Sequence, residues 1–156
     1  TSFTTLIAAR EPCSATGQAD NLARPTDAVW ADIDGLRVIA AHPPPPINNE
    51  FTAERDAFIR AGISAATGAV PAIFVGDFNA APWSPIADEI RRAGLRRAHC
   101  GGAIAPTWRS RHVLFGLAID HVYVSPDLSV RSCSIGAAIG SDHWPLILEF
   151  VGPAPD

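Results

Sequence analysis

The segment Ala72-Ile73-Phe74-Val75 constrains the fold of this chain more than any other stretch. It is short, contains only apolar residues and follows Pro71 directly. Such a run suits a β-strand that is buried on both faces, because a half-exposed strand would alternate apolar and polar residues. The sequence has helical patterns before and after this strand and only strand patterns later, which favours a layered α/β domain.

Two amphipathic helices are expected to flank this strand. Before it, Thr52 can cap a helix that Gly68 is placed to end. The apolar face of this helix carries Ile59, Ile63 and Ala66. After the strand, Ser84-Pro85 is typical of the start of a second helix, and Gly94 is placed to end it. The apolar stripe of the second helix is Ile86, Ile90 and Ala93.

A β-hairpin is expected upstream of the first helix. Apolar and polar residues alternate on both sides of Asp34-Gly35, a pair typical of a type I′ turn. The second strand ends at His42, because the four prolines that follow have no N–H to donate to a ladder. Further upstream, residues 3–7 suit one short strand, and residues 12–25 read as a loop.

The last third of the chain reads as strands alone. The expected segments are 119–125, a turn at 126–127, a stretch within 129–137, a loop at 140–143, and 146–150. In the last of these, Leu146, Leu148 and Phe150 share one face, as the period of two requires.

The composition favours one ordered domain over a disordered chain, because 47% of the 156 residues are apolar and 18% are charged. No apolar stretch nears the roughly 18 residues that a membrane span needs. Twelve arginines, no lysine and sixteen acids give a net charge of -4, so a strongly cationic nucleic-acid footprint is absent. The arginines cluster only within residues 91–97, which we interpret as a solvated helix face.

The cysteines indicate no metal or redox motif. They lie far apart, at Cys13, Cys100 and Cys133, and form no CxxC pair. We interpret them as free thiols, since free cysteine is often buried. One disulfide is the alternative, so the redox compartment stays open. We also interpret Trp83, Trp108 and Trp144 as packing residues, with stacking on a base or packing on a lipid headgroup as the alternative.

Polar residues gather where β-type runs end. The positions are His42, Asp77 with Asn79, Asp120 with His121, and Asp142 with His143. Catalytic groups often collect there, because side chains at strand ends escape the packed layers. Each site alone also has an ordinary explanation, such as a turn or a strand-end histidine. In a regular strand, Asp120 and His121 point to opposite faces. A serine triad at Ser141 lacks the GxSxG elbow.

Three ordered motifs carry a family resemblance: Gly76-Asp77-Phe78-Asn79, Ile119-Asp120-His121 with the strand to Ser125, and Gly140-Ser141-Asp142-His143-Trp144-Pro145. Together they resemble the endonuclease/exonuclease/phosphatase superfamily over about residues 27–150. His42 at a strand end and Pro106-Thr107-Trp108 are similar to the same pattern. The resemblance implies a portion of a two-sheet α/β sandwich, and metal-assisted cleavage of a phosphoester by water.

The resemblance also implies a role for each matching residue. Asp77 orients or deprotonates the attacking water, and Asn79 binds a phosphate oxygen. His143 contacts the scissile phosphate, while Asp120 hydrogen-bonds and orients that histidine. This chemistry is physically compatible, because donors and a divalent cation stabilise charge that develops on phosphate oxygens while a carboxylate handles the proton.

One part of the family pattern is missing. The resemblance places Asp142 at or near the metal, Mg²⁺ or Mn²⁺, and His42 at the phosphate or the leaving group. The family also has an Asn-containing strand and then a Glu that is the principal Mg²⁺ ligand, and neither occurs before His42. We therefore expect weak metal binding. We expect residues 1–156 to be a single incomplete domain, whose exposed sheet edge needs the missing N-terminal part or a partner chain.

The expected function is phosphodiester or phosphomonoester hydrolysis in the full-length parent, with this fragment inactive alone. The alternative is a non-catalytic binding or interaction module that retains the fold. The substrate class stays open between nucleic acid, lipid and small phosphoester. The proline run after His42 resembles bacterial members with membrane-spanning segments ahead of an exported catalytic domain. The expected location is therefore the extracytoplasmic side of a membrane-anchored parent.

Overall fold

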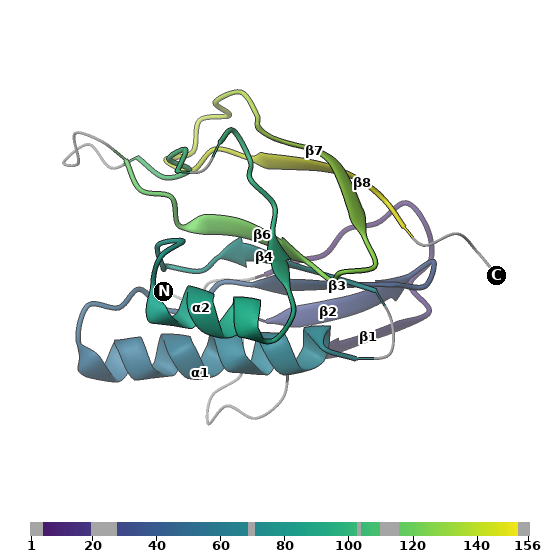
Figure 1. Ribbon diagram of the computed structural model, residues 1–156, viewed down its shortest axis with the longest axis horizontal. Helices are drawn as coiled ribbons and strands as arrows, with labels where there is room; N and C mark the ends of the chain where they lie inside the picture. Colours follow the sequence, from purple (N-terminus) through teal and green to yellow (C-terminus); the bar gives the residue numbers. More distant parts are fainter. Residues whose placement is uncertain (1–4, 20–27, 69–70, 103, 110–115, 153–156) are drawn as a thin grey trace.

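The computed structural model describes residues 5–19, 28–68, 71–102, 104–109 and 116–152. These residues form three layers, in which two helices cover one face of a six-stranded sheet and a two-stranded sheet covers the other (Figure 1). The helices are α1 (Asn49–Ala66) and α2 (Pro85–Arg92). The strands are β1 (Ala15–Gln18), β2 (Val29–Ile33), β3 (Leu36–Ala41), β4 (Ala72–Asp77), β5 (Arg96–Arg97), β6 (Asp120–Val124), β7 (Ser129–Ile135) and β8 (Leu146–Val151). The expected two-sheet α/β architecture is confirmed.

The buried strand predicted from residues 72–75 is β4, and it lies inside the six-stranded sheet. The order of that sheet is β1-β2-β3-β4-β6-β5, with β3 and β4 parallel and the other neighbours antiparallel. Phe74 packs toward the helices, where a Cβ at Gly62 of α1 would overlap its ring. Ile73 packs in a second cluster with residues of β7 and β8. Both faces of β4 are therefore covered, as an all-apolar strand requires.

The predicted hairpin is confirmed as β2 and β3. Val29 pairs with Ala40 and Ile33 with Leu36, so the register centres on the turn at Asp34-Gly35. The φ angles of these two turn residues are 50° and 73°. Two positive φ values define the type I′ turn, whose twist matches that of the flanking strands.

The predicted start of α1 is four residues too late. Asn48 is the N-cap, and its side chain accepts a hydrogen bond from the Phe51 backbone N–H. Thr52 lies within the helix, where its hydroxyl donates to the Asn48 carbonyl. The C-cap is Thr67, so Gly68 lies directly after the end of the helix, as predicted. The start of α2 is as predicted, since the Ser84 side chain accepts from Ala87 N and Pro85 opens the helix.

Two short strands were not expected. Residues 12–25 read as a loop, but β1 lies within them and pairs with β2. Residues 5–7 of the expected N-terminal strand are not in a strand, and residues 3–4 lie outside the described residues. The arginine cluster is not one helix face, because Arg96 and Arg97 form β5 at the edge of the sheet, while Arg91 and Arg92 end α2. β1 and β5 are strands because each pairs with a neighbouring strand, and the local sequence pattern does not encode that pairing.

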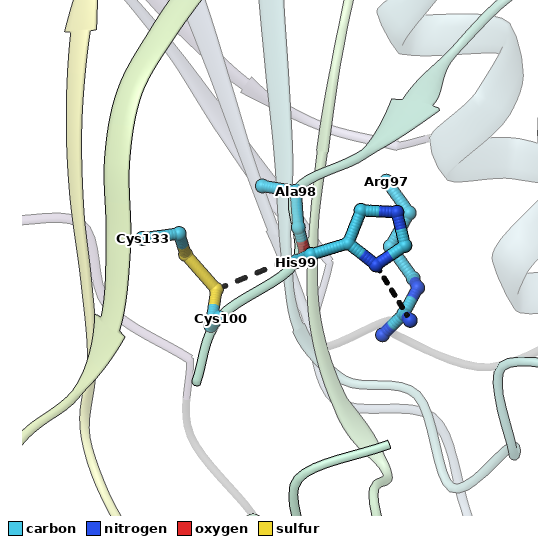
Figure 2. Close-up of a disulfide and its surroundings, with 5 residues drawn as sticks. All are labelled: Arg97, Ala98, His99, Cys100 and Cys133. Atoms are coloured by element: carbon cyan, nitrogen blue, oxygen red, sulfur yellow. Dashed lines mark hydrogen bonds between the residues drawn. A yellow bond between two sulfur atoms is a disulfide. The ribbon is translucent and has the colours of Figure 1, made fainter. Parts of the chain in front are cut away.

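Two of the three cysteines are bonded, so the interpretation of all three as free thiols is wrong. Cys100 and Cys133 form a disulfide, with Cα atoms 4.3 Å apart (Figure 2). Cys13 is free and exposed. Cys133 belongs to β7, whereas Cys100 follows β5. The disulfide therefore links the chain just beyond the edge of one sheet to the other sheet.

The outward face of β8 is exposed and carries two apolar side chains on either side of Glu149. Leu146 and Leu148 pack inward against the cluster between the sheets, as predicted, whereas Phe150, which was expected on the same face, is 37% exposed. Ile147 and Val151 are 52% and 42% exposed.

Among the described residues, no helix combines the length and the hydropathy that crossing a membrane requires.

Candidate functional site

Three polar residues lie side by side at one end of the six-stranded sheet. Ala41 at the end of β3 pairs with Gly76 of β4, so His42 follows next to Asp77. Asp77, the last residue of β4, pairs directly with Asp120, the first residue of β6. A Cβ at Gly76, whose φ is 150°, would overlap the Ala41 carbonyl oxygen. Glycine therefore permits the close approach that aligns these three positions.

His143 reaches this row from the loop between β7 and β8. Its Nδ1 lies 2.9 Å and 3.1 Å from the two carboxylate oxygens of Asp120. Its Nε2 lies 3.8 Å from Oδ2 of Asp77, and the same oxygen lies 3.6 Å from Nε2 of His42. The structure thus brings together four predicted residues, one from each of three strand ends and one from the second sheet.

The Asp120–His143 contact fixes how the imidazole presents itself. A carboxylate only accepts hydrogen bonds, so Nδ1 of His143 carries the proton that it donates to Asp120. Nε2 then faces Asp77, and the ring is held in one tautomer. The His143 side chain is 31% exposed, whereas that of Asp120 is 16% exposed. The partner of the histidine is therefore more sheltered than the histidine itself.

Thr107 connects the Asp120 strand to the His143 loop. Its buried hydroxyl accepts hydrogen bonds from the backbone N–H groups of Ile119 and Asp120, and its carbonyl accepts from Trp144 N. Thr107 therefore sets the distance between the backbone at Asp120 and the backbone beside His143. The Pro106-Thr107-Trp108 motif pointed to this segment, although the sequence did not indicate the contacts.

Asn79 sits in a tight turn directly after β4. Its backbone N–H donates to Oδ1 of Asp77 at 2.8 Å, and its φ of 47° is left-handed. Its side-chain nitrogen donates to the Pro43 carbonyl at 3.0 Å, which ties the turn to the segment after His42. The turn explanation for Asp77 and Asn79 is confirmed. It does not compete with a functional role, because Oδ2 of Asp77 still faces the two histidines.

Arg55 is a supporting residue that the sequence analysis missed. It is 8% exposed, and its Nη1 donates to the Asn79 carbonyl at 3.1 Å. The other side of its guanidinium binds Asp56. The sequence did indicate that Arg55 would be buried, because it stands four residues before Ile59 and so lies on the apolar face of α1. A buried arginine that binds a left-handed turn residue holds that turn in place.

Burial raises the pKa of the Asp77 carboxyl above its ordinary value. Desolvation is the largest cause, and the nearby charge of Asp120 acts in the same direction. The Asn79 N–H and the charges of His143 and His42 oppose it. A carboxylate whose pKa is raised toward neutral is a stronger base than a fully solvated one.

Two residues of the sequence motifs do not join this group. His121 points to the other side of β6, as predicted, where it is buried and its Nε2 lies 2.8 Å from the Ala80 carbonyl oxygen. Asp142 accepts a hydrogen bond from the Trp108 indole at 3.0 Å. This contact is the main reason that the pKa of Asp142 is lowered. In the structure, Asp142 braces the His143 loop against Trp108.

Residues 5–143 match the sequence model of the Endonuclease/Exonuclease/phosphatase family. The chain belongs to this family. No curated protein sequence matches the chain.

Solved structures of this family have the same fold. An AP endonuclease from Archaeoglobus fulgidus is 18% identical, with a TM-score of 0.73 over 90% of this chain and 72% of that chain. A 3′ phosphatase from Neisseria, bound to a product DNA hairpin, is 19% identical, with a TM-score of 0.70 over 91% and 72%. An endonuclease/exonuclease/phosphatase from Beutenbergia cavernae DSM 12333 is 18% identical, with a TM-score of 0.65 over 81% and 39%.

The donor set of the site suits a divalent cation. Asp77, Asp120 and His143 each offer one ligand atom, and these atoms lie within 4.8 Å of one another. Carboxylate oxygens suit Mg²⁺ and Mn²⁺, which usually keep several waters and share the oxygens of a substrate phosphate. Family membership and this donor set favour phosphoester hydrolysis as the class of reaction.

Proposed function

We propose that this chain carries the hydrolytic centre of a divalent-cation-dependent phosphoesterase. The single observation that carries the proposal is the convergence of His143, Asp77 and His42, with Asp120 behind His143. The two imidazoles can donate hydrogen bonds to phosphate oxygens. The carboxylate oxygen that they face can accept a proton from water.

Asp77 is the residue that we assign to the attacking water. Its Oδ1 is occupied by the Asn79 N–H, whereas its Oδ2 faces the histidines. Oδ2 would accept the proton of the water as the new P–O bond forms. The raised pKa of Asp77 helps this step, because a base works best when its pKa lies near the working pH.

His143 and Asn79 are assigned to the phosphate. His143 would donate a hydrogen bond from Nε2 when its ring is protonated, with the carboxylate of Asp120 stabilising that charge. An amide nitrogen carries two N–H groups. One N–H of Asn79 binds Pro43, and the second would bind a phosphate oxygen. His42 would stabilise the leaving oxygen from the other side of Asp77.

The carboxylates of Asp77 and Asp120 would hold the cation, so that Nε2 of His143 stays available to the phosphate, and waters and the substrate would fill its other positions. When bound, the cation neutralises charge that develops on the phosphate oxygens. We expect weak binding, because the Asn strand and Glu of the family pattern do not occur before His42 and Asp142 is engaged by Trp108. We therefore expect slow turnover by this chain alone.

The test is hydrolysis of a small activated phosphodiester at saturating Mn²⁺, by this chain and by any longer natural form of it. We expect Asp77→Asn and His143→Ala each to lower kcat/KM by about 10²- to 10⁴-fold. Asp127→Asn, in an exposed turn, is the matched control and retains the activity. Equal rates in the unchanged chain and its three variants would contradict the assignment and favour a non-catalytic binding module.

We also propose that the chain works in an oxidising compartment. The Cys100–Cys133 disulfide supports this location, because disulfides persist outside the reducing cytosol. An extracytoplasmic domain of a membrane-anchored bacterial protein fits that condition. Titration of native protein with a thiol reagent, after rapid trapping from cells, would report one reactive thiol if the bond forms in vivo and three if it does not.

A further inference from the structure

A pocket of about 680 Å³ lies outside the group of four residues, between α2, β5 and the loop that precedes α2. Trp83 comes from that loop and Arg91 from the last turn of α2. Arg96, Arg97 and His99 come from β5 and the residues after it. The volume is in the range of pockets that hold one drug-sized ligand, such as a nucleotide.

The walls of this pocket are cationic. Three of the twelve arginines of a chain with net charge -4 line it, and none of the described lining residues is acidic. Arg91 pairs with Asp88 behind it, which offsets part of one charge. Burial is the main reason that the pKa of Arg97 is lowered, and the positive charge of Arg91 lowers it further. An anionic ligand would relieve this repulsion between like charges.

Protein contacts hold the guanidinium groups in place. Arg91 donates to the Pro82 carbonyl at 3.1 Å, and Arg96 donates to the Leu128 carbonyl at 2.7 Å. Arg97 lies 3.2 Å from Nδ1 of His99, on the segment that leads to the disulfide (Figure 2). Side chains fixed by such contacts lose less conformational entropy when they bind an anion.

Trp83 adds an aromatic surface to these charges. Its side chain is 68% exposed, so the interpretation of this tryptophan as a packing residue is wrong. An exposed indole beside guanidinium groups is typical of surfaces that stack nucleic-acid bases and track their phosphates. A lipid headgroup would use the charges but would gain less from the indole face.

The pocket lies within reach of the proposed hydrolytic site. Trp83 follows Asn79 by four residues, so at most about 14 Å of chain separates their Cα atoms. A stacked strand advances about 3.4 Å per nucleotide, so this span covers about four nucleotides. The two places are therefore near enough for one strand of a few nucleotides to reach both.

We propose that the pocket at Trp83, Arg91 and Arg97 binds a nucleotide of a single-stranded nucleic acid whose phosphodiester lies at His143 and Asp77. This inference rests on the proposed function, whose substrate class it names. The indole stacks on a base, and the guanidinium groups contact phosphates on one side of the bond to be cleaved.

The test is the fluorescence anisotropy of a short labelled single-stranded oligonucleotide that is titrated with the full chain in EDTA. We expect Trp83→Ala to weaken binding about tenfold or more. Ile104→Ala is the matched control, because Ile104 is 62% exposed and does not line the pocket. Its affinity should equal that of the unchanged protein.

Salt dependence separates phosphate contacts from a change of fold. Arg91→Gln should reduce the slope of log affinity against log salt by about 0.7, the value for one contact to a single strand. Arg92→Gln removes the same charge from the same helix, but Arg92 does not line the pocket, so the slope should stay unchanged. Circular dichroism of both variants confirms that α2 is intact.

The outcomes distinguish the two proposals. If Trp83→Ala and Arg91→Gln bind the oligonucleotide as the unchanged protein does, the inference is wrong, whatever the rate on a small phosphodiester. If binding depends on the pocket but no form hydrolyses the small phosphodiester, the proposed function fails and the pocket stands. Binding to anionic lipid vesicles that both variants lose, without oligonucleotide binding, would assign the pocket to a lipid and overturn the inference.

Discussion

Asp77 shows how a single residue combines fold and function. Its Oδ1 completes a turn with Asn79, and its Oδ2 faces two imidazoles. Burial and the neighbouring Asp120 make its ionised form unfavourable. A group whose pKa is raised in the folded state destabilises the fold at any pH above that pKa, because the unfolded chain ionises more easily. The charge that suits the chemistry therefore lowers stability.

We therefore predict that Asp77→Asn stabilises the metal-free protein while it lowers kcat/KM for hydrolysis. At neutral pH the variant should have the higher free energy of unfolding, since asparagine keeps the acceptor for Asn79 without the charge. The difference should shrink as the pH falls through the raised pKa of Asp77, and vanish below its ordinary value of 3.8. Urea unfolding in EDTA across this pH range measures it. A constant difference at every pH would show that the charge is not its cause.

The sequence indicated which residues would meet, but not how they would meet. Strand period correctly separated Asp120 from His121, because successive side chains alternate faces. It could not show that Asp142 would turn to Trp108, since loop side chains have no period. Arg55 is a similar case, because a charged residue on an apolar helix face has no visible partner in the sequence.

Among the elements, those with strong local signals were predicted well. The β2–β3 hairpin and the start of α2 follow from Asp34-Gly35 and Ser84-Pro85, which act within a few residues. The start of α1 was misplaced because both Asn48 and Thr52 are good capping residues. β1 and β5 were missed because each is an edge strand that a neighbour induces.

The hydrogen bonds that Thr107 accepts lead to a prediction about the stability of the segment beside the site. Thr107→Val removes the acceptor for the Ile119 and Asp120 N–H groups and leaves them without a partner. We expect a loss of about 1–3 kcal/mol in the free energy of unfolding, the cost of unsatisfied buried groups. Thr107→Ser keeps the hydroxyl and should lose less. Denaturant unfolding compares the two variants, and equal losses would assign the effect to packing alone.

At the scale of the whole molecule, the site exists only where two sheets meet. His42, Asp77 and Asp120 stand on the six-stranded sheet, and His143 comes from the β7–β8 loop. The Cys100–Cys133 disulfide and the cluster around Ile73 and Val124 hold the sheets together. The relative position of the sheets therefore sets the distance from His143 to Asp77.

We predict that removal of the disulfide weakens both stability and the site. Cys100 and Cys133 are 33 residues apart, and closing a loop of that length stabilises a fold by about 3–4 kcal/mol. The Cys100→Ser/Cys133→Ser variant should unfold at lower denaturant and show a higher KM. Cys13→Ser is the control, because Cys13 is free and exposed. If reducing agent leaves the unfolding midpoint of the unchanged protein in place, the disulfide does not contribute.

The outward face of β8 exposes two apolar side chains on either side of Glu149. Ile147 and Val151 lie on it, and the described residues of the two-stranded sheet leave it open. The expectations of a missing N-terminal part and of a partner chain stay predictions. A size measurement in solution, by sedimentation or light scattering, addresses whether copies of the chain cover this face.

Sequence patterns predicted the layered α/β class, the hairpin, the buried strand and the strand-end positions of His42, Asp77 and Asp120. These follow from periodicity and turn chemistry, which act over a few residues. The disulfide, the edge strands, the contact of Asp142 with Trp108 and the cationic pocket at Trp83 became visible only in the folded structure. Each of these depends on contacts between residues far apart in the chain, which local patterns do not specify.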